Sequence, residues 1–350
     1  MKILYVTDHI DIARASGGFI NDYQNDLVFY GLRELFGDDV VDSTQIISLY
    51  KEYEGKIHPQ HLWGGMTTFW LIEQNNIDRT NIEEKIKDRF YDFIIYGAIQ
   101  RCKQYYDIVS RVYPKEKVIL VDGNDEPTLD PLYQKHLYFK RELVTKHPNL
   151  IPITFGIPTP KLALPNKNKT QDYATCIPGQ PETYIFKDEK SYYEDYQKSF
   201  YGVTMKKAGW DAMRHYEILG NYCMPYFVGL EDCPEDTLAN LPKDLLLQGK
   251  KLADNFDQQE YFRILDEVFK YTQDNLTTKH IAGHATKAGQ RIIPNKSYEK
   301  TAALLFDKVL VKSTNWSHDF ATKKQGILVS ESFSVTYTDG TTVDYTNSNQ

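Results

Sequence analysis

The sequence predicts an α/β fold of two Rossmann-like lobes with a cleft between them. The chain has 350 residues, more than a typical single domain, which favours two lobes. Runs of β-branched and aromatic residues alternate with segments of helical periodicity, a pattern typical of parallel sheets. A proline-rich stretch separates two such series. We therefore expect a first lobe over residues 1–155, a second lobe over 170–297, and a remainder over 298–350.

The first lobe begins with a strand, a glycine turn and a helix. The strand is expected over residues 2–7, the turn at Gly17-Gly18, and the helix over 19–36, where Gly37 ends it. The elements expected next are a strand over 91–98, a helix carrying Cys102, Tyr106 and Val109, and a strand over 117–121. Parallel strands collect functional groups at their carboxyl ends, so polar residues after each strand are of interest.

The boundary between the lobes is expected in residues 152–172, where four prolines forbid a regular helix. The elements expected after it are strands over 173–177, 200–205 and 224–228, and helices over 191–198, 212–222, 242–253 and 258–274. On the last helix Tyr261, Leu265, Val268 and Phe269 share one face. A helix over 298–311 is expected to return to the first lobe, followed by a β-hairpin around Asp339-Gly340.

Composition excludes several classes of protein. The formal net charge of −7 argues against a protein that coats duplex DNA or RNA, although a local basic patch stays open. No apolar run approaches the ~18–20 residues of a membrane span. The amino-terminal residues show no secretory signal, and the four cysteines lack disulfide or CxxC spacing. We therefore expect a cytoplasmic protein with free thiols.

The most informative segment runs from Lys206 to Tyr226. A strand leads to Lys206-Lys207, then to a turn at Gly209 and a helix for which Asp211 is the expected N-cap. A helix start offers unpaired N–H groups and partial positive charge, which suit a diphosphate. Arg214 in the first turn can grip a phosphate, and Glu217 one turn later can accept the hydroxyls of a ribose.

The same residues have a simpler interpretation. Arg214 and Glu217 at i,i+3 can form an ordinary surface ion pair, and Lys206-Lys207 can be a solvated charge pair. What favours a binding site is the order of features: strand, basic turn, glycine, helix with Arg then Glu, and a second strand after Gly220.

That order resembles the donor-binding unit of the two-lobed glycosyltransferases, the GT-B architecture, and is most similar to its CgeB-like and "glycosyl transferases group 1" branch. The matching stretches are residues 213–219 and 224–227, and in the first half 22–23, 30–33, 62–66, 122–125 and 138–143. The sequence departs from the family at Gly220-Asn-Tyr222, where Ala-x-Gly is usual, and after Thr314. The resemblance implies that a nucleoside-diphosphate sugar binds the second lobe and the acceptor binds the first, without a metal.

Further candidates lie in the first half. Gly17-Gly18 resembles the glycine loop near the donor phosphates, although a simple turn explains it as well. An inverting transferase needs a general base, for which His9, Asp11 and Asp122 follow expected strands. Asp22, Lys140 and Arg141 are candidates for binding the acceptor. Each of these residues can instead be a cap, a turn residue or a solvated charge.

The sequence therefore predicts an enzyme that moves a sugar from a nucleoside-diphosphate sugar to a hydroxyl of a glycan, a lipid-linked glycan, a small molecule or a modified base. We expect no cofactor beyond this co-substrate and no metal, because His280 and His284 lack a third ligand. Two alternatives stay open: a non-catalytic nucleotide- or glycan-binding protein of the same fold, and a GT-B-like sugar epimerase.

Overall fold

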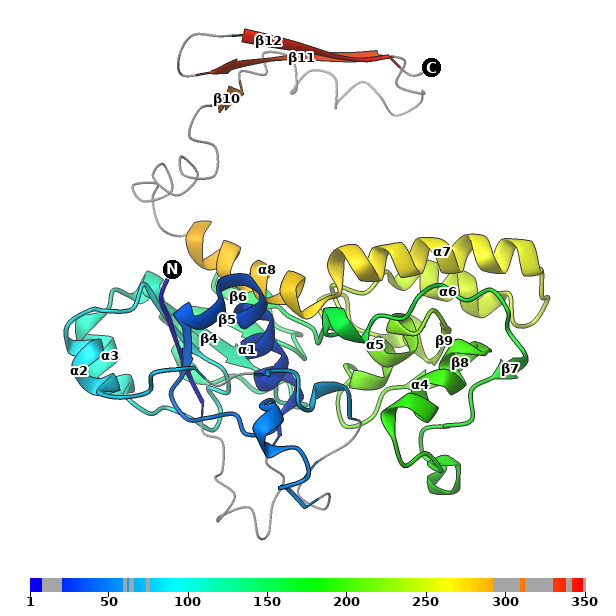
Figure 1. Cartoon of the computed structure of the whole chain (residues 1–350), viewed down its shortest axis with the longest axis horizontal. Helices are drawn as coiled ribbons and strands as arrows, with labels where there is room; N and C mark the ends of the chain where they lie inside the picture. Colours follow the sequence, from blue (N-terminus) through cyan, green and yellow to red (C-terminus); the bar gives the residue numbers. More distant parts are fainter. Residues whose placement is uncertain are drawn as a thin grey trace. The chain divides into compact units, whose positions relative to one another are not determined.

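The computed structural model describes residues 1–7, 21–58, 62, 66–73, 76–291, 309–311, 330–337 and 342–348. His9, Asp11, Gly17 and Gly18 lie outside these described residues, as does most of the helix expected over 298–311. The chain divides into two compact units, Met1–Ile292 and Ile293–Gln350 (Figure 1). The larger unit contains both parallel sheets and all the remaining candidate site residues.

The first sheet has six parallel strands in the order β2-β1-β3-β4-β5-β6. Their bounds are β1 (Ile3–Val6), β2 (Val40–Asp42), β3 (Phe93–Tyr96), β4 (Val118–Asp122), β5 (Leu137–Lys140) and β6 (Leu150–Pro152). The strands expected over 2–7, 91–98 and 117–121 correspond to β1, β3 and β4. All residues of these three strands are buried, as expected for a parallel sheet covered on both faces.

Alternate residues of β1 show which helices cover each face. Leu4 and Val6 join a core cluster that also contains residues of α2 (Ile82–Lys87) and α3 (Tyr106–Val112). Tyr5 points to the other face, where its ring lies 5.4 Å from that of Phe29 in α1 (Tyr23–Phe36). The first sheet is therefore a central layer between helices.

The helix that packs against the first part of the chain is α8 (Thr278–Arg291), which lies beside α1 (Figure 1). The Thr278 hydroxyl donates to Glu34 Oε2 at 2.5 Å. A Cβ added to Gly31 would lie 2.1 Å from the backbone oxygen of Thr278, so the absence of a side chain permits this close approach. Of the helix expected over 298–311, the described part, Val309–Val311, is instead strand β10.

Replacing Gly31 by alanine is expected to lower the free energy of unfolding by about 1–3 kcal/mol, because the new methyl group overlaps a backbone that cannot rotate away. Gly283→Ala in α8 is the matched control, since its Cβ would meet Leu35 at an ordinary 3.8 Å. That control is expected to be neutral or stabilising through helix propensity. Urea unfolding measures both variants, and equal stability of the two would contradict the packing described.

The second sheet has three parallel strands in the order β7-β8-β9: β7 (Gln171–Tyr173), β8 (Ser199–Met205) and β9 (Met224–Val228). Pro225 is tolerated because β9 is an edge strand. The helices around this sheet are α4 (Glu189–Gln197), α5 (Met213–Gly220), α6 (Lys243–Lys251) and α7 (Gln258–Asn275). The face predicted for α7 is confirmed, because its four apolar residues are all buried.

The smaller unit contains an antiparallel sheet in the order β10-β11-β12, with β11 (Ser330–Tyr337) and β12 (Thr342–Ser348). The pairing of Val335 with Val343 confirms the predicted hairpin, whose turn lies outside the described residues. Within the described part of the chain, every helix is too short or too polar to cross a bilayer.

Candidate functional site

The turn between β8 and α5 carries the basic residues that the sequence singles out. Lys206 and Lys207 follow β8 directly and are exposed, and Lys206 Nζ lies 5.2 Å from the centre of the Trp210 ring. The N-cap of α5 is Ala212, which supplies no side-chain hydrogen bond to the helix. The prediction that Asp211 caps this helix is therefore wrong. The N–H groups in the first turn of α5 therefore lack a side-chain cap, and two exposed lysines precede this turn in the chain.

Asp211 is instead buried against the end of the first sheet. Its Oδ2 accepts a hydrogen bond of 2.9 Å from the backbone N–H of Phe155, which follows β6. Burial raises the pKa of Asp211 from 3.8 to about 7, and the nearby Arg141 guanidinium opposes this rise. The residue expected to cap a helix thus anchors the β8–α5 turn to the other sheet.

Arg214 lies in the first turn of α5 and is half-buried. Its guanidinium donates to the Cys176 carbonyl at 3.4 Å and lies 5.0 Å from the centre of the Tyr184 ring. Among the described residues no carboxylate forms an ion pair with Arg214. Burial lowers the pKa of its guanidinium, but nearby groups that include the charged Glu217 favour the protonated form and raise the pKa overall. The interpretation of this pair as an ordinary surface salt bridge is therefore wrong.

The Glu217 carboxylate lies in a buried network of hydroxyl groups and is 3% exposed. Thr67, in the 3-10 helix η5 (Met66–Thr68), donates to Glu217 Oε1 at 2.5 Å, and Tyr192 of α4 donates to Oε2 at 2.8 Å. Tyr193 is bonded to the same Thr67 hydroxyl at 2.6 Å. Burial raises the pKa of Glu217, while these hydroxyl donors lower it. The structure thus holds Glu217 as an acceptor for two hydroxyl groups.

Asp122 and Lys140 form a buried ion pair at the carboxyl ends of β4 and β5. Both side chains are fully buried, and Lys140 Nζ lies 3.1 Å from Asp122 Oδ1. Asp122 also accepts hydrogen bonds from Gln100 at 2.8 Å and from Tyr138 at 2.5 Å. Burial lowers the pKa of Lys140, an effect that Asp122 opposes. In this structure the two side chains are paired with each other at the edge of the sheet, and neither is exposed to solvent.

Arg141 connects this sheet edge to the β8–α5 turn. Its side chain is 3% exposed and donates to the carbonyl groups of Gly123 at 2.7 Å and Asp211 at 2.5 Å. It also pairs with Glu142, at 3.2 Å, and with Asp125. Glu142 in turn accepts the backbone N–H groups of Trp210 at 3.0 Å and Asp211 at 2.9 Å. The carboxyl ends of the two parallel sheets therefore meet through one buried polar cluster.

Asp22 is the N-cap of α1, where it accepts the N–H of Asn25 at 3.0 Å, and it pairs with Arg101 at 2.6 Å. Its Oδ1 lies 3.9 Å from the position of a Cβ on Gly123, so it belongs to the same sheet edge as Asp122. The structure thus brings Asp22, Asp122, Lys140 and Arg141 to one region, although each is engaged there in structural contacts.

Sequence reasoning missed Glu142, Thr67 and Tyr192. Glu142 accepts a hydrogen bond from the backbone of the β8–α5 turn, while Thr67 and Tyr192 donate hydrogen bonds to the Glu217 carboxylate. Thr67 is 150 positions from Glu217, and no local pattern reports a contact at that separation. The sequence has 26 tyrosines, and nothing in it distinguishes Tyr192 from the others.

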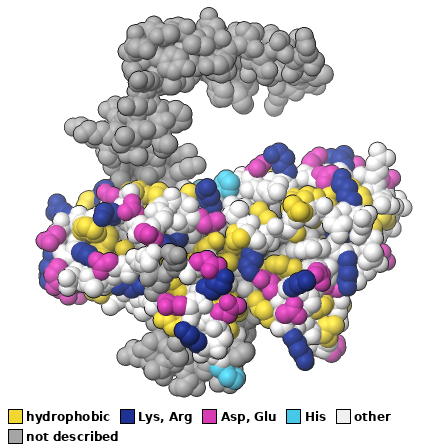
Figure 2. All heavy atoms as spheres, in the orientation of Figure 1, with side chains coloured by type: hydrophobic (Ala, Val, Ile, Leu, Met, Phe, Trp, Pro, Cys, Tyr) yellow, Lys and Arg dark blue, Asp and Glu magenta, His cyan; other side chains and the backbone are white. Residues whose placement is uncertain are grey.

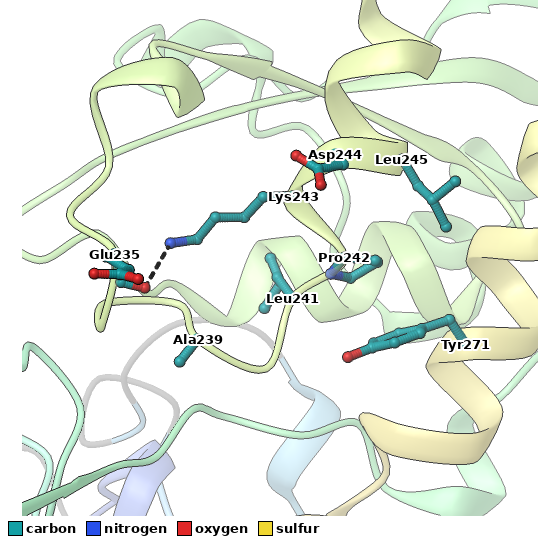
Figure 3. A pocket seen from close by; sticks show the side chains of 8 residues that line it. All are labelled: Glu235, Ala239, Leu241, Pro242, Lys243, Asp244, Leu245 and Tyr271. Atoms are coloured by element: carbon teal, nitrogen blue, oxygen red, sulfur yellow. Dashed lines mark hydrogen bonds between the residues drawn. The ribbon is translucent and has the colours of Figure 1, made fainter. Parts of the chain in front are cut away.

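Neither Arg214 nor Glu217 lines the hollows found beside α6, along α4, beside α1 or beside the start of β1 in the described part of the chain. One hollow of about 430 Å³ lies beside α6 and is drawn in Figure 3. There Lys243 extends toward the backbone of Glu235, whose carbonyl accepts at 3.2 Å, and Tyr271 closes the opposite side (Figure 3). The hollow contains none of the predicted site residues.

Two further features of the described residues are the distribution of their charged side chains and the grouping of possible metal ligands. On the face drawn in Figure 2, basic and acidic side chains of the described residues are interspersed rather than gathered into patches of one sign. Within the described ranges, no three His, Cys, Asp or Glu side chains are grouped to hold a metal ion. All four cysteines lie in these ranges, and none of them forms a disulfide. Comparison with protein-family models and with curated protein sequences returns no match for this chain.

Proposed function

We propose that this protein is a glycosyltransferase of the GT-B type, which moves a sugar from a nucleoside-diphosphate sugar to an acceptor hydroxyl without a metal. In this proposal the two parallel sheets are the cores of two lobes, and the donor binds in a cleft at their carboxyl ends. The observation that carries the proposal is the start of α5, which lacks a side-chain cap and is preceded in the chain by the exposed Lys206 and Lys207.

The proposed diphosphate lies against the first turn of α5. The N–H groups there and the two lysine ammonium groups supply the positive charge that would otherwise come from a metal ion. Arg214, which has no carboxylate partner among the described residues, supplies a planar guanidinium for a phosphate oxygen. These charges stabilise the leaving diphosphate as the bond to the sugar breaks.

The proposed ribose binds to Glu217. Its hydroxyls take the two acceptor positions that the hydroxyls of Thr67 and Tyr192 occupy in this structure. Such an exchange replaces one hydroxyl donor by another, so the buried carboxylate keeps its hydrogen bonds. It requires η5 and α4 to move apart, which is the kind of opening that lobed enzymes use to admit substrate.

The proposed acceptor approaches from the first sheet, past Asp22 and the Gly123 turn. His9 and Asp11 follow β1 in the sequence and are our candidates for the general base together with Asp122. Of the three, Asp122 is described, and its burial favours a supporting role in which it holds Lys140. Lys140 and Arg141 then shape this edge of the sheet rather than contact the acceptor.

Glu217→Gln is expected to lower kcat/KM for hydrolysis or transfer of a nucleotide sugar by about 10- to 100-fold, because a neutral amide accepts hydroxyls less strongly and presents a donor to one of them. The assay uses UDP-glucose, UDP-N-acetylglucosamine, GDP-mannose and ADP-glucose. Glu231→Gln, at an exposed glutamate paired with Lys250, is the matched control and is expected to leave activity unchanged. Wild-type protein that turns over none of these donors would contradict the proposal.

A further inference from the structure

A second hollow, of about 500 Å³, lies along one face of α4. Its walls come from three segments that are distant in sequence: residues 70–73, residues 160–163, and the face of α4 that carries Glu189, Tyr193 and Gln197. Asn221, just after α5, closes one end. The volume falls in the range of small-molecule sites, about 300–1,000 Å³. None of the residues assigned above to the nucleotide sugar lines this hollow.

Each charged residue that lines the hollow has an ion-pair partner. Lys161 pairs with Glu189 at 2.5 Å across the hollow itself. Lys190 pairs with Glu194 at 3.8 Å, and Glu73 pairs with Lys51 at 2.7 Å. A phosphate or a carboxylate would therefore find no cation without a partner among these lining residues. This balance favours a ligand that carries no charge.

The remaining lining residues are two aromatic residues, two primary amides and the aliphatic residues Leu71, Pro160, Leu162 and Ala163. Trp70 is half-buried. Tyr193 is 8% exposed, and its hydroxyl is bonded to Thr67, so the part of Tyr193 that lines the hollow is its ring. Gln197 is half-buried and donates to Asn221 Oδ1 at 2.8 Å, and its amide keeps donor and acceptor positions that this bond does not use. Asn221 is fully buried, and its Nδ2 donates to the Glu217 carbonyl at 2.8 Å. Flat apolar faces beside groups that both donate and accept hydrogen bonds are the chemical complement of a sugar ring.

Backbone strain at Trp70 points to the same place. Its φ is 58°, in the left-handed region that bulky residues rarely adopt. Such strain persists where the surrounding structure enforces it, and it concentrates at sites that bind ligands. The backbone N–H of Trp70 is fixed by the Ser48 carbonyl at 3.0 Å, so the side chain is held at the rim of the hollow.

We infer that this hollow binds an uncharged saccharide, with Trp70 and Tyr193 as its aromatic walls and Gln197 as its hydrogen-bonding group. The inference does not depend on the transfer reaction, because the site can hold a glycan whether or not the protein acts on it. Its wall is connected to the proposed donor site, since Tyr193 bonds the Thr67 hydroxyl that also donates to Glu217.

The test is a glycan array that carries neutral oligosaccharides of glucose, galactose, mannose and N-acetylglucosamine, together with sulfated and sialylated counterparts, followed by calorimetry on the best binder. Trp70→Gly removes the aromatic ring and suits the left-handed backbone, so the variant is expected to fold. Gln197→Ala removes one amide. Both variants are expected to weaken binding of a neutral glycan by about tenfold or more.

Tyr271→Ala, at the hollow of Figure 3, and Gln258→Ala, at an exposed glutamine, are the matched controls and are expected to bind normally. No binding of any neutral glycan, a preference for acidic glycans, or binding by both site variants that equals that of the wild type would each overturn the inference. Turnover of nucleotide sugars is measured separately in the same variants. Failure of the saccharide site therefore leaves the transferase proposal standing, and the reverse also holds.

Discussion

Replacing Arg141 by methionine is expected to lower the free energy of unfolding by about 3–5 kcal/mol, the largest loss that we predict for a single side chain. The guanidinium is buried and donates to carbonyl groups of Gly123 and Asp211, which methionine cannot do. It is also the cation beside Glu142, whose side chain is 6% exposed. The variant leaves a buried carboxylate without its counter-ion.

The control for Arg141 is Arg263→Met. Arg263 also pairs with two carboxylates, Glu260 and Glu267, each at 2.6 Å, but its side chain is 49% exposed. Water and salt screen such pairs, so the loss is expected to stay below about 1 kcal/mol. Urea unfolding of both variants measures the difference. Similar losses in the two would show that the buried cluster does not join the sheets as described.

Asp211→Asn is expected to change how stability depends on pH. The pKa of Asp211 rises from 3.8 in the unfolded chain to about 7 in the folded protein, so the folded state binds this proton more tightly. The associated stability is fully present below about pH 4 and is lost as the pH rises through about 7. The full shift corresponds to about 4 kcal/mol as an upper limit.

Asparagine keeps an oxygen for the Phe155 N–H but cannot ionise, so this contribution to the pH dependence disappears in the variant. Relative to wild type, the variant is expected to gain stability between about pH 4 and pH 8. Unfolding free energies measured across this interval check the prediction. Parallel pH profiles of the two proteins would mean that Asp211 titrates normally.

Sequence periodicity identified the strands and helices whose own residues carry a clear apolar pattern. Met224–Val228 was predicted as a strand and forms β9, because a short apolar run between Cys223 and Gly229 has few alternatives. Strand β5 was missed because it ends in Lys140, whose charge is balanced only by Asp122 on the neighbouring strand. Strand β2 was missed because three residues carry no periodic signal.

The candidate site could be predicted only in part. The order of β8, the two lysines and α5 is local, and the structure has it as expected. Asp211 does not cap α5, because its side chain accepts a hydrogen bond from the backbone of Phe155, 56 residues earlier. This tertiary contact outweighs the general preference of aspartate for the N-cap position. The hydroxyl partners of Glu217 likewise come from η5 and α4, which no spacing on α5 reveals.

The central claim is that a nucleotide binds at the start of α5, and its most direct test is thermal unfolding of the wild type and of Arg214→Met with UDP, GDP and ADP. For the preferred nucleotide at about 100 times its Kd, the wild type is expected to gain about 2.7 kcal/mol of stability, which appears as a raised Tm. Arg214→Met is expected to lose most of this gain. An unchanged Tm of the wild type with all three nucleotides would contradict the account.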